Sequence, residues 1–422
     1  MQVDNMYRKP NGKIGVIVAQ APIENLIFEG GGPKGLVYVG ATEVLEEKGI
    51  LRSAKNVGGS SAGAMTALAI GLGYNAWQIQ QIVYNQDIND FTDVQDHETP
   101  EIFGKLSNTI KGLSNLLFGS PEKGRGIFLG NKLQRWIRNI INERVNEACT
   151  IARADENRLC PTLAKELKQK NGNLTFGELI ELGEKFPELG IKDMAFTGTN
   201  YTDKTLEVFS YHTTPNMPID LAVRISVSLP WFFKTIKYNG KEYMDGGCLD
   251  NYPMGIFDHP PYLKQDQIKL TIGVYNQNLC TLGLKVDSEE EMRKILWEGA
   301  KEDNTGWFAS LIKGVKTKVA KLCIGVDYVN ASKATDKATY AKYAHRTIQI
   351  PDLGYSTFNF NLTDADKGKL ATAGRDATLE WFRLYYDEAG IELELNNISE
   401  LIPYLTSDEL SYVKWRFDEF FK

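Results

Sequence analysis

The sequence predicts an α/β fold with a mainly parallel central sheet and added helices. The chain opens with a short apolar strand over residues 23–28, a glycine cluster, and a helix of regularly spaced apolar residues that Gly49 ends. The same order then repeats as a strand ending at Val57, a sharp turn, and a small-residue helix over residues 62–70. Strand, turn and helix in alternation are typical of parallel sheets, because each helix carries the chain back to the edge where the next strand starts.

The later elements are predicted from the same periodicities. In chain order they are a helix capped by Asn131, strands over residues 194–199 and 205–211, a helix over residues 219–227, a strand ending at Met244, a core strand over residues 269–275, a strand over residues 345–350, a helix from Thr363 towards Tyr386, and a helix from Thr406. No linker rich in proline, glycine and serine separates these parts. We therefore predict an N-terminal extension over residues 1–22, one large α/β domain over residues 23–386, and a short helical segment over residues 387–422.

Composition excludes several classes of protein. The 422 residues include 48 lysines and arginines against 54 aspartates and glutamates, a net charge of -6, which does not favour a nucleic-acid binder. Five scattered cysteines without a CxxC pair favour neither a disulfide framework nor a zinc site, and no cofactor or metal is expected. No apolar run suits a signal peptide or a membrane-spanning helix, so we expect a soluble protein.

The first chemical motif is the glycine-rich loop, residues 30–35, which reads GGGPKG between a strand and a helix. Glycines let the backbone approach a ligand and present several N–H groups to a phosphate or a developing oxyanion. The spacing Gly30-x-Gly32-x-x-Gly35 also fits a dinucleotide fingerprint. That alternative expects an acidic residue near the end of the next strand, where this sequence has Val57 followed by glycines. A tight connection without a ligand is the plainest alternative.

The second motif is Gly59-Ser60-Ser61-Ala62-Gly63, which matches the GxSxG nucleophile elbow with Ser61 at its centre. A serine hydroxyl needs a base to take its proton. The chain has four histidines, and none of them lies in a motif typical of catalysis. They are His97, His212, His259 and His345.

The third motif is Asp245-Gly246-Gly247, in which an acid follows a strand end and precedes a tight turn. Asp-Gly turns are common, so the tripeptide alone says little. A carboxylate is a weak base, but it can serve if it is partly desolvated and within hydrogen-bond reach of the serine. The fold would have to bring Ser61 and Asp245 together across 184 positions.

These three motifs, in this order, resemble those of the patatin-like phospholipase family, GGGx[K/R]G, GxSxG and DG[G/A]. The segments 222–230, 126–128 and 175–179 and the run Asn251-Tyr252-Pro253 are similar to further landmarks of that family. The resemblance covers residues 23–275 and weakens towards residue 386. It implies a three-layer sandwich and a lipid acyl hydrolase of the phospholipase A type.

The resemblance also implies roles for individual residues. Ser61 would be the nucleophile and Asp245 the base, in a dyad without histidine. The N–H groups of Gly31, Gly32 and Gly35 would form the oxyanion hole, while Pro33 has no N–H to give. The residues that support the motifs would be Gly30, Lys34, Gly59, Gly63, Gly246 and Gly247, with Lys34 steadying the loop or meeting a lipid phosphate.

Within the family, the motif spelling is most similar to bacterial effector phospholipases. This implies delivery into a host cell without a cleaved signal peptide, a host protein as activator, and peripheral contact with a phospholipid membrane. Two basic amphipathic segments, residues 102–118 and 307–322, suit a membrane surface, although an ordinary surface helix with its apolar face in the core is the first expectation for each. The aromatic-rich segment 396–422 would dock on the core or bind a partner.

Two other functions remain open on the sequence alone. The first is a serine esterase with a histidine triad on an α/β-hydrolase scaffold, which would need His345 or His259 and not Asp245. The second is a catalytically silent module that binds a membrane or a host protein.

Overall fold

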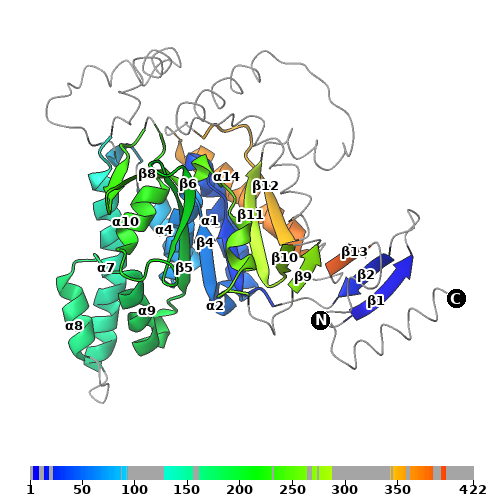
Figure 1. Ribbon diagram of the computed structural model, residues 1–422, viewed down its shortest axis with the longest axis horizontal. Helices are drawn as coiled ribbons and strands as arrows, with labels where there is room; N and C mark the ends of the chain where they lie inside the picture. Colours follow the sequence, from blue (N-terminus) through cyan, green and yellow to red (C-terminus); the bar gives the residue numbers. More distant parts are fainter. Residues whose placement is uncertain are drawn as a thin grey trace, which may run out of the picture.

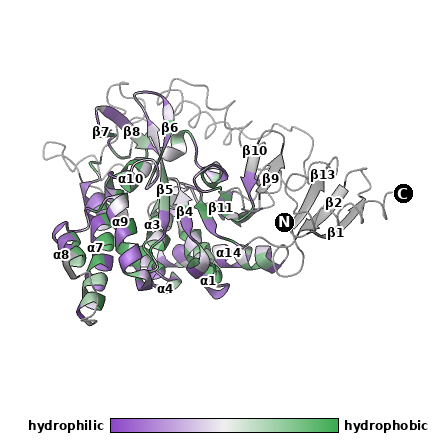
Figure 2. Ribbon diagram, turned by 60° about the horizontal axis from the view of Figure 1, so that its bottom comes forward, coloured by the Kyte–Doolittle hydropathy of each residue, from purple (hydrophilic) through white to green (hydrophobic). Residues whose placement is uncertain are grey.

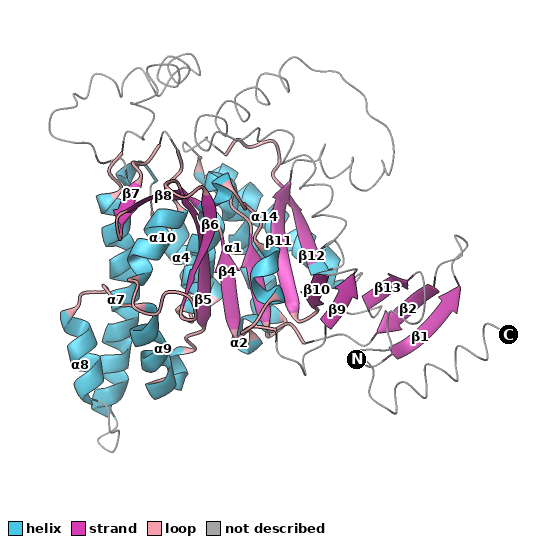
Figure 3. Cartoon of the chain, viewed as in Figure 1, coloured by secondary structure: helices cyan, strands magenta, loops and turns pink. Residues whose placement is uncertain are grey.

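An eight-stranded mixed sheet forms the centre of the computed structural model (Figures 1 and 3). The structure describes residues 3–8, 14–18, 22–86, 88–91, 93, 128–154, 161–230, 232–263, 269–272, 275–287, 343, 346–357, 362–383 and 391–395. The strand order is β12-β11-β3-β4-β5-β8-β7, with β6 paired to β5 off this path. The first five strands in this order run parallel, and β6, β7 and β8 add antiparallel pairs at one side.

The elements have the following bounds. The strands of the central sheet are β3 (Asn25–Phe28), β4 (Asn56–Gly59), β5 (Asp193–Asn200), β6 (Thr205–Ser210), β7 (Ile236–Tyr238), β8 (Lys241–Asp245), β11 (Thr281–Asp287) and β12 (Thr347–Pro351). The α-helices are α1 (Val37–Glu47), α2 (Ile50–Ser53), α3 (Ala62–Gly71), α4 (Ala76–Tyr84), α7 (Asn131–Ala154), α8 (Pro161–Gln169), α9 (Phe176–Lys185), α10 (Ile219–Ser226) and α14 (Asp364–Trp381). The 3-10 helices are η1 (Gly32–Leu36), η2 (Ile88–Phe91), η4 (Pro187–Leu189), η5 (Gly246–Cys248) and η6 (Met254–Asp258).

The two faces of the sheet are covered by different layers. Side chains alternate along a strand, and on β3 Leu26 and Phe28 enter the large core shared with α1, α3 and α14. Ile27 points to the other face, where Tyr252 and η6 pack over it. The predicted three-layer α/β architecture is therefore confirmed. Figure 2 shows hydrophobic and hydrophilic residues alternating along α7 and α8, as expected for helices with one buried side.

Helix α1 lies against α14 at very short range. A Cβ on Gly40 would come within 1.8 Å of the Ala371 carbonyl oxygen, and one on Gly374 within 1.7 Å of the Val37 carbonyl oxygen. Only glycine permits such contact between the two backbones. The late helix predicted from Thr363 thus becomes part of the layer that supports the glycine-rich loop.

One predicted strand is corrected by the structure. The stretch predicted as a core strand over residues 269–275 contains β9 (Lys269–Ile272), which pairs with β10 (Tyr275–Asn278) in a separate two-stranded sheet. The core position beside β3 is taken by β11. Both stretches are rich in β-forming residues, and only the long-range pairing with β3 distinguishes them.

The residue that caps the N-terminus of α7 also differs from the predicted one. The carboxylate of Asp93 accepts hydrogen bonds from the N–H groups of Gly130 (2.7 Å), Asn131 (2.8 Å) and Lys132 (3.2 Å). Asn131 is the first helical residue, and an acid 38 positions earlier caps the helix. A negative charge at a helix N-terminus is stabilising because the first N–H groups have no partner inside the helix.

The two ends of the chain share a small antiparallel sheet. Strand β2 (Ile14–Val18) pairs with β1 (Val3–Arg8) on one side and with β13 (Ile391–Leu395) on the other (Figure 1). The segment 387–422, predicted to be helical, therefore contains a strand. The helix predicted from Thr406 lies outside the described residues.

Candidate active site

Ser61 lies in a sharp turn between β4 and α3. Its backbone has φ 52° and ψ -123°, in a region that costs a non-glycine residue about 1–3 kcal/mol. The Ser61 N–H donates a hydrogen bond to the Ser226 hydroxyl at 3.1 Å, which helps to hold this conformation. A Cβ at Gly63 would come within 2.2 Å of the Phe28 carbonyl oxygen, so the turn requires glycine there. The nucleophile-elbow geometry predicted from GxSxG is confirmed.

Asp245 ends β8 and is nearly buried, with 2% of its surface exposed. Its Oδ1 accepts the Gly247 N–H at 2.7 Å, and its own N–H donates to the Ser228 carbonyl at 3.1 Å. Burial raises the pKa of Asp245 from 3.8 to about 7, and interactions with the Ser61 hydroxyl and the Gly247 N–H offset part of that rise. The fold thus brings Ser61 and Asp245 together, although 184 positions separate them.

The second carboxylate oxygen of Asp245 faces a different environment. Oδ2 is buried and makes no well-aligned hydrogen bond to any described residue. The Ser61 hydroxyl nonetheless interacts with the carboxylate. Rotation of this hydroxyl about a single bond can align it with the carboxylate. Catalytic hydrogen bonds are often poorly aligned in a site without substrate.

The glycine-rich loop runs beside the elbow. A Cβ on Gly30 would lie 3.0 Å from the Ser61 Cβ, and one on Gly35 would lie 3.0 Å from the Ala62 Cβ. Gly32 adopts φ +54°, and a Cβ there would come within 2.5 Å of the Thr357 carbonyl oxygen. Small residues are needed at these positions because two backbones meet here.

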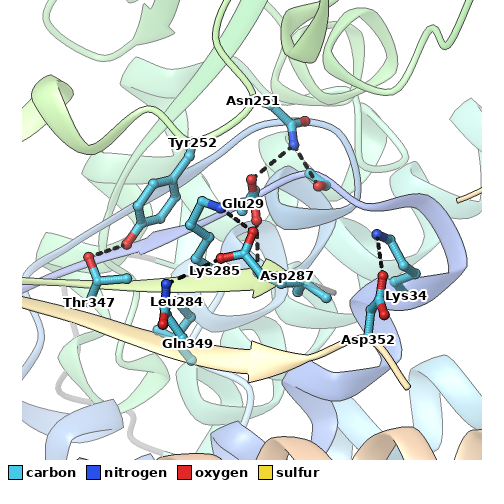
Figure 4. A network of polar contacts seen from close by, with 12 residues as sticks. Glu29, Lys34, Asn251, Tyr252, Leu284, Lys285, Asp287, Thr347, Gln349 and Asp352 are labelled. Carbon is cyan, nitrogen blue, oxygen red and sulfur yellow. Dashed lines mark hydrogen bonds and ion pairs between the residues drawn. The ribbon is translucent and has the colours of Figure 1, made fainter. Parts of the chain in front are cut away.

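Lys34 projects from this loop to a partner that sequence reading did not anticipate. Its Nζ lies 3.1 Å from Oδ2 of Asp352, just past the end of β12 (Figure 4). Asp352 Oδ1 in turn accepts the Gly354 N–H at 2.9 Å. Of the two roles considered for Lys34, this contact supports steadying of the loop.

Two further residues near the loop were not predicted as site residues (Figure 4). Asn251 accepts the Gly30 N–H with its carbonyl at 3.0 Å, and its Nδ2 donates to the Gly30 carbonyl at 2.8 Å and to Glu29 Oε1 at 3.3 Å. Glu29 Oε2 accepts the Val286 N–H at 2.7 Å. Burial raises the pKa of Glu29 to about 7, while the Lys285 ammonium opposes that rise and the Asp287 charge adds to it. The Asn251-Tyr252-Pro253 landmark was the signal that could have pointed to Asn251.

An apolar cavity of about 710 Å³ opens at Ser61. Its lining follows one side of α3 through Met65 to Ala69, eight positions beyond Ser61, so it extends about 12 Å at 1.5 Å per residue. Further walls are built by α4, α7 and the segment from Val227 to Phe233. A second hollow of about 700 Å³ is lined mainly by polar and basic residues of α7 and contains neither Ser61 nor Asp245. The apolar cavity is therefore the one suited to a long hydrocarbon chain.

The described histidines lie away from Ser61. His212 places Nε2 3.0 Å from Oδ2 of Asp193, which begins β5, whereas Ser61 follows the opposite end of β4. His259 is exposed and follows η6. His97 and His345 lie outside the described residues, as do the segments 102–118, 307–322 and 396–422. Within the described part of the chain, every helix is too short or too polar to span a bilayer.

Comparisons with known proteins agree with this geometry. The sequence model of the patatin-like phospholipase family matches residues 26–258, which contain all three motifs. An uncharacterised protein of Bacillus subtilis is 30% identical over 237 residues, covering 55% of this chain and 65% of that protein. A protein of Invertebrate iridescent virus 6, described as a probable lipid hydrolase, is 37% identical over 90 residues, 21% of this chain and 29% of that protein.

Solved structures of two bacterial proteins share the fold. VipD of Legionella pneumophila aligns with a TM-score of 0.51 and 17% identity, covering 98% of this chain and 76% of that one. ExoU of the Pseudomonas aeruginosa type III secretion system, solved in complex with SpcU, aligns with a TM-score of 0.52 and 20% identity, covering 99% of this chain and 62% of that one. At these identities the likeness concerns the fold. The family match over more than half of the chain, with the elbow serine and the buried aspartate in place, shows that the chain belongs to the patatin-like phospholipase family.

Proposed function

We propose that the protein is a lipid acyl hydrolase of the phospholipase A type that uses a Ser61–Asp245 dyad. The observation that carries this proposal is the strained, cavity-facing Ser61 beside the buried Asp245. A carboxylate with a pKa of about 7 is a far better base than an exposed one near 3.8. Desolvation therefore supplies the basicity that histidine provides in other serine hydrolases.

The reaction has two halves. In the first, Ser61 Oγ attacks the ester carbonyl carbon while its proton passes to Asp245, and the ester C–O bond then breaks as the leaving alcohol takes that proton. In the second, water attacks the acyl carbon and gives a proton to Asp245, the bond to Oγ breaks, and Oγ recovers a proton as the fatty acid departs.

The glycine-rich loop is the proposed oxyanion hole. Gly31, Gly32 and Gly35 remain the candidate donors, because the Gly30 N–H is already donated to the Asn251 carbonyl. Gly32 and Gly35 line the same cavity as Ser61, which supports this role. Removal of one such donor typically costs 10²–10³-fold in rate.

The substrate class follows from the cavity. Its lining is mostly aliphatic and aromatic and begins at the nucleophile, which suits a fatty-acyl chain with its ester carbon at Ser61. We propose phospholipids at a membrane surface as the substrate, in keeping with the family. The basic segments 102–118 and 307–322 are the proposed membrane contacts.

We further propose that the protein acts as a bacterial effector inside a host cell, with a host protein as activator. The shared fold with VipD and ExoU supports this, and ExoU was solved with a protein partner, SpcU. The chain spans 62% of the ExoU chain and 65% of the Bacillus relative. The assay of fatty-acid release therefore includes a comparison with and without host-cell material, so that activation by a host protein is tested as well.

The test is fatty-acid release from phospholipid vesicles, with and without eukaryotic cell extract. Ser61→Ala is expected to abolish release, and Asp245→Asn is expected to lower its rate by about 10²–10⁴-fold. Ser60→Ala is the matched control, because it removes a buried neighbouring hydroxyl without a described partner and should leave release unchanged. Full activity of Asp245→Asn together with loss in His345→Ala would instead establish a histidine triad. Release that extract does not increase would exclude the activator.

A further inference from the structure

We infer that Asn251 is a positioning residue that sets the direction of the Gly31 N–H, through the peptide plane that joins Gly30 to Gly31. This inference rests on the proposed function, because it assigns the Gly31 N–H to the oxyanion hole. It adds a residue to the site that lies six positions beyond Asp245 and does not touch the reacting atoms.

Asn251 forms hydrogen bonds with both backbone polar groups of Gly30. The Asn251 carbonyl accepts the Gly30 N–H at 3.0 Å, and the Asn251 side-chain amide donates to the Gly30 carbonyl at 2.8 Å (Figure 4). In a trans peptide the C=O of one residue and the N–H of the next point in opposite directions within one plane. Fixing the Gly30 carbonyl therefore fixes the direction of the Gly31 N–H.

Such a clamp is needed because the loop has little stiffness of its own. Three consecutive glycines have no Cβ atoms to restrict their dihedrals, so the Gly30–Gly31 peptide could rotate at small cost. A rotated plane would aim a carbonyl oxygen where a donor is required. An oxyanion hole gains its effect from donors that are oriented before the reaction.

Asn251 is itself wedged between the two loops of the site. A Cβ on Gly30 would come within 2.3 Å of Asn251 Oδ1, and one on Gly247 within 2.5 Å of the same atom. The turn after Asp245 is closed by hydrogen bonds from the Leu249 and Asp250 N–H groups to the Gly246 carbonyl. The position of Asn251 is thus fixed relative to Asp245. Asn251 therefore also fixes the glycine-rich loop relative to Asp245.

Glu29 orients the side chain of Asn251. One carboxylate oxygen accepts Asn251 Nδ2 at 3.3 Å, and the other accepts the Val286 N–H of β11 at 2.7 Å. The Glu29 carbonyl also accepts the Tyr38 hydroxyl at 2.8 Å. Because Nδ2 faces two acceptors, the Asn251 amide has one orientation that satisfies both.

The experiment compares Asn251→Ala and Asn251→Asp with Tyr252→Phe in the vesicle assay, with thermal unfolding measured for each. Asn251→Asp keeps the size of the side chain but loses its N–H donor. Tyr252→Phe is the matched control, because it removes the adjacent buried hydroxyl, bonded to Thr347 Oγ1 at 2.9 Å, which has no contact with Gly30. Both Asn251 variants should lower kcat by about 100-fold or more with KM within about twofold, and Tyr252→Phe should keep its kcat.

A loss in the Asn251 variants no greater than that in Tyr252→Phe, or a change in KM alone, would overturn the inference. A crystal structure of Asn251→Ala separates it from the proposed function. A reoriented Gly30–Gly31 peptide supports the clamp, and an unchanged peptide refutes it, whatever the activity. Undiminished release by Ser61→Ala would instead refute the proposed function.

Discussion

Two buried carboxylates near the glycine-rich loop have pKa values raised to about 7, yet their surroundings differ. Glu29 has both oxygens occupied, by Asn251 and by Val286, and the Lys285 ammonium lies near enough to oppose the rise. Asp245 has one oxygen on Gly247, while the other has no well-aligned partner among the described residues, and the Ser61 hydroxyl interacts with the carboxylate. A similar pKa therefore does not imply a similar role. This difference supports the proposed assignment of Asp245 as the base and of Glu29 as a support.

The largest expected effect is a difference in kcat between variants of Asp245 and of Glu29. Asp245→Asn removes the base and should lower kcat by about 10²–10⁴-fold. Glu29→Gln keeps one acceptor for Asn251 or Val286 and should lower kcat by about tenfold, through a loosened loop. Initial rates of fatty-acid release from vesicles, normalised to folded protein, measure both. Equal losses of kcat in the two variants would contradict the different roles of Asp245 and Glu29.

The next effect is a difference in the pH dependence of folding stability between variants of the same two residues. Between about pH 4 and pH 7 folded Asp245 keeps a proton that the unfolded chain releases, so stability falls as pH rises through this window. Asp245→Asn removes that penalty, which is at most about 4 kcal/mol for three pKa units, and should be more stable than the wild type at pH 8.

Glu29→Gln removes a similar penalty, because the pKa of Glu29 is also raised to about 7, but it leaves one buried N–H without its acceptor, which costs about 1–3 kcal/mol. It should therefore gain less stability at pH 8 than Asp245→Asn does, and it should be less stable than the wild type at pH 5. Urea unfolding at pH 5 and pH 8 distinguishes the two variants. Destabilisation of both at pH 8 would show that Asp245 is a structural group as well.

The smallest expected effect concerns Lys34, the cation of the same loop. Lys34→Met removes the contact with Asp352 and should cost about 1–2 kcal/mol, between the values for exposed and buried ion pairs. The ratio of activities on zwitterionic and anionic vesicles should not change. A selective loss on anionic vesicles would show that Lys34 meets a negatively charged lipid headgroup.

Local patterns sufficed to predict the sharp turn at Ser61, the glycine turn after Asp245 and the first half of the sheet. Ser61 stands in a motif whose strained turn demands small neighbours, and Asp245 precedes a glycine turn. The contacts of Lys34 and Asn251 could not be predicted, because their partners lie 318 and 221 positions away. The same reason explains β11, since its place beside β3 depends on pairing between distant segments. The cap of α7 by Asp93 likewise comes from outside the helix and its adjoining residues.

The most direct test of the central claim is the pH dependence of Ser61 labelling by a fluorophosphonate, read by peptide mass spectrometry. We expect a label on Ser61 and not on Ser60, with a rate that rises with pH and a midpoint of about 7, where Asp245 loses its proton. In Asp245→Asn the label should form far more slowly and without that midpoint. A wild-type midpoint that survives in Asp245→Asn, or a label on another serine, would contradict the dyad.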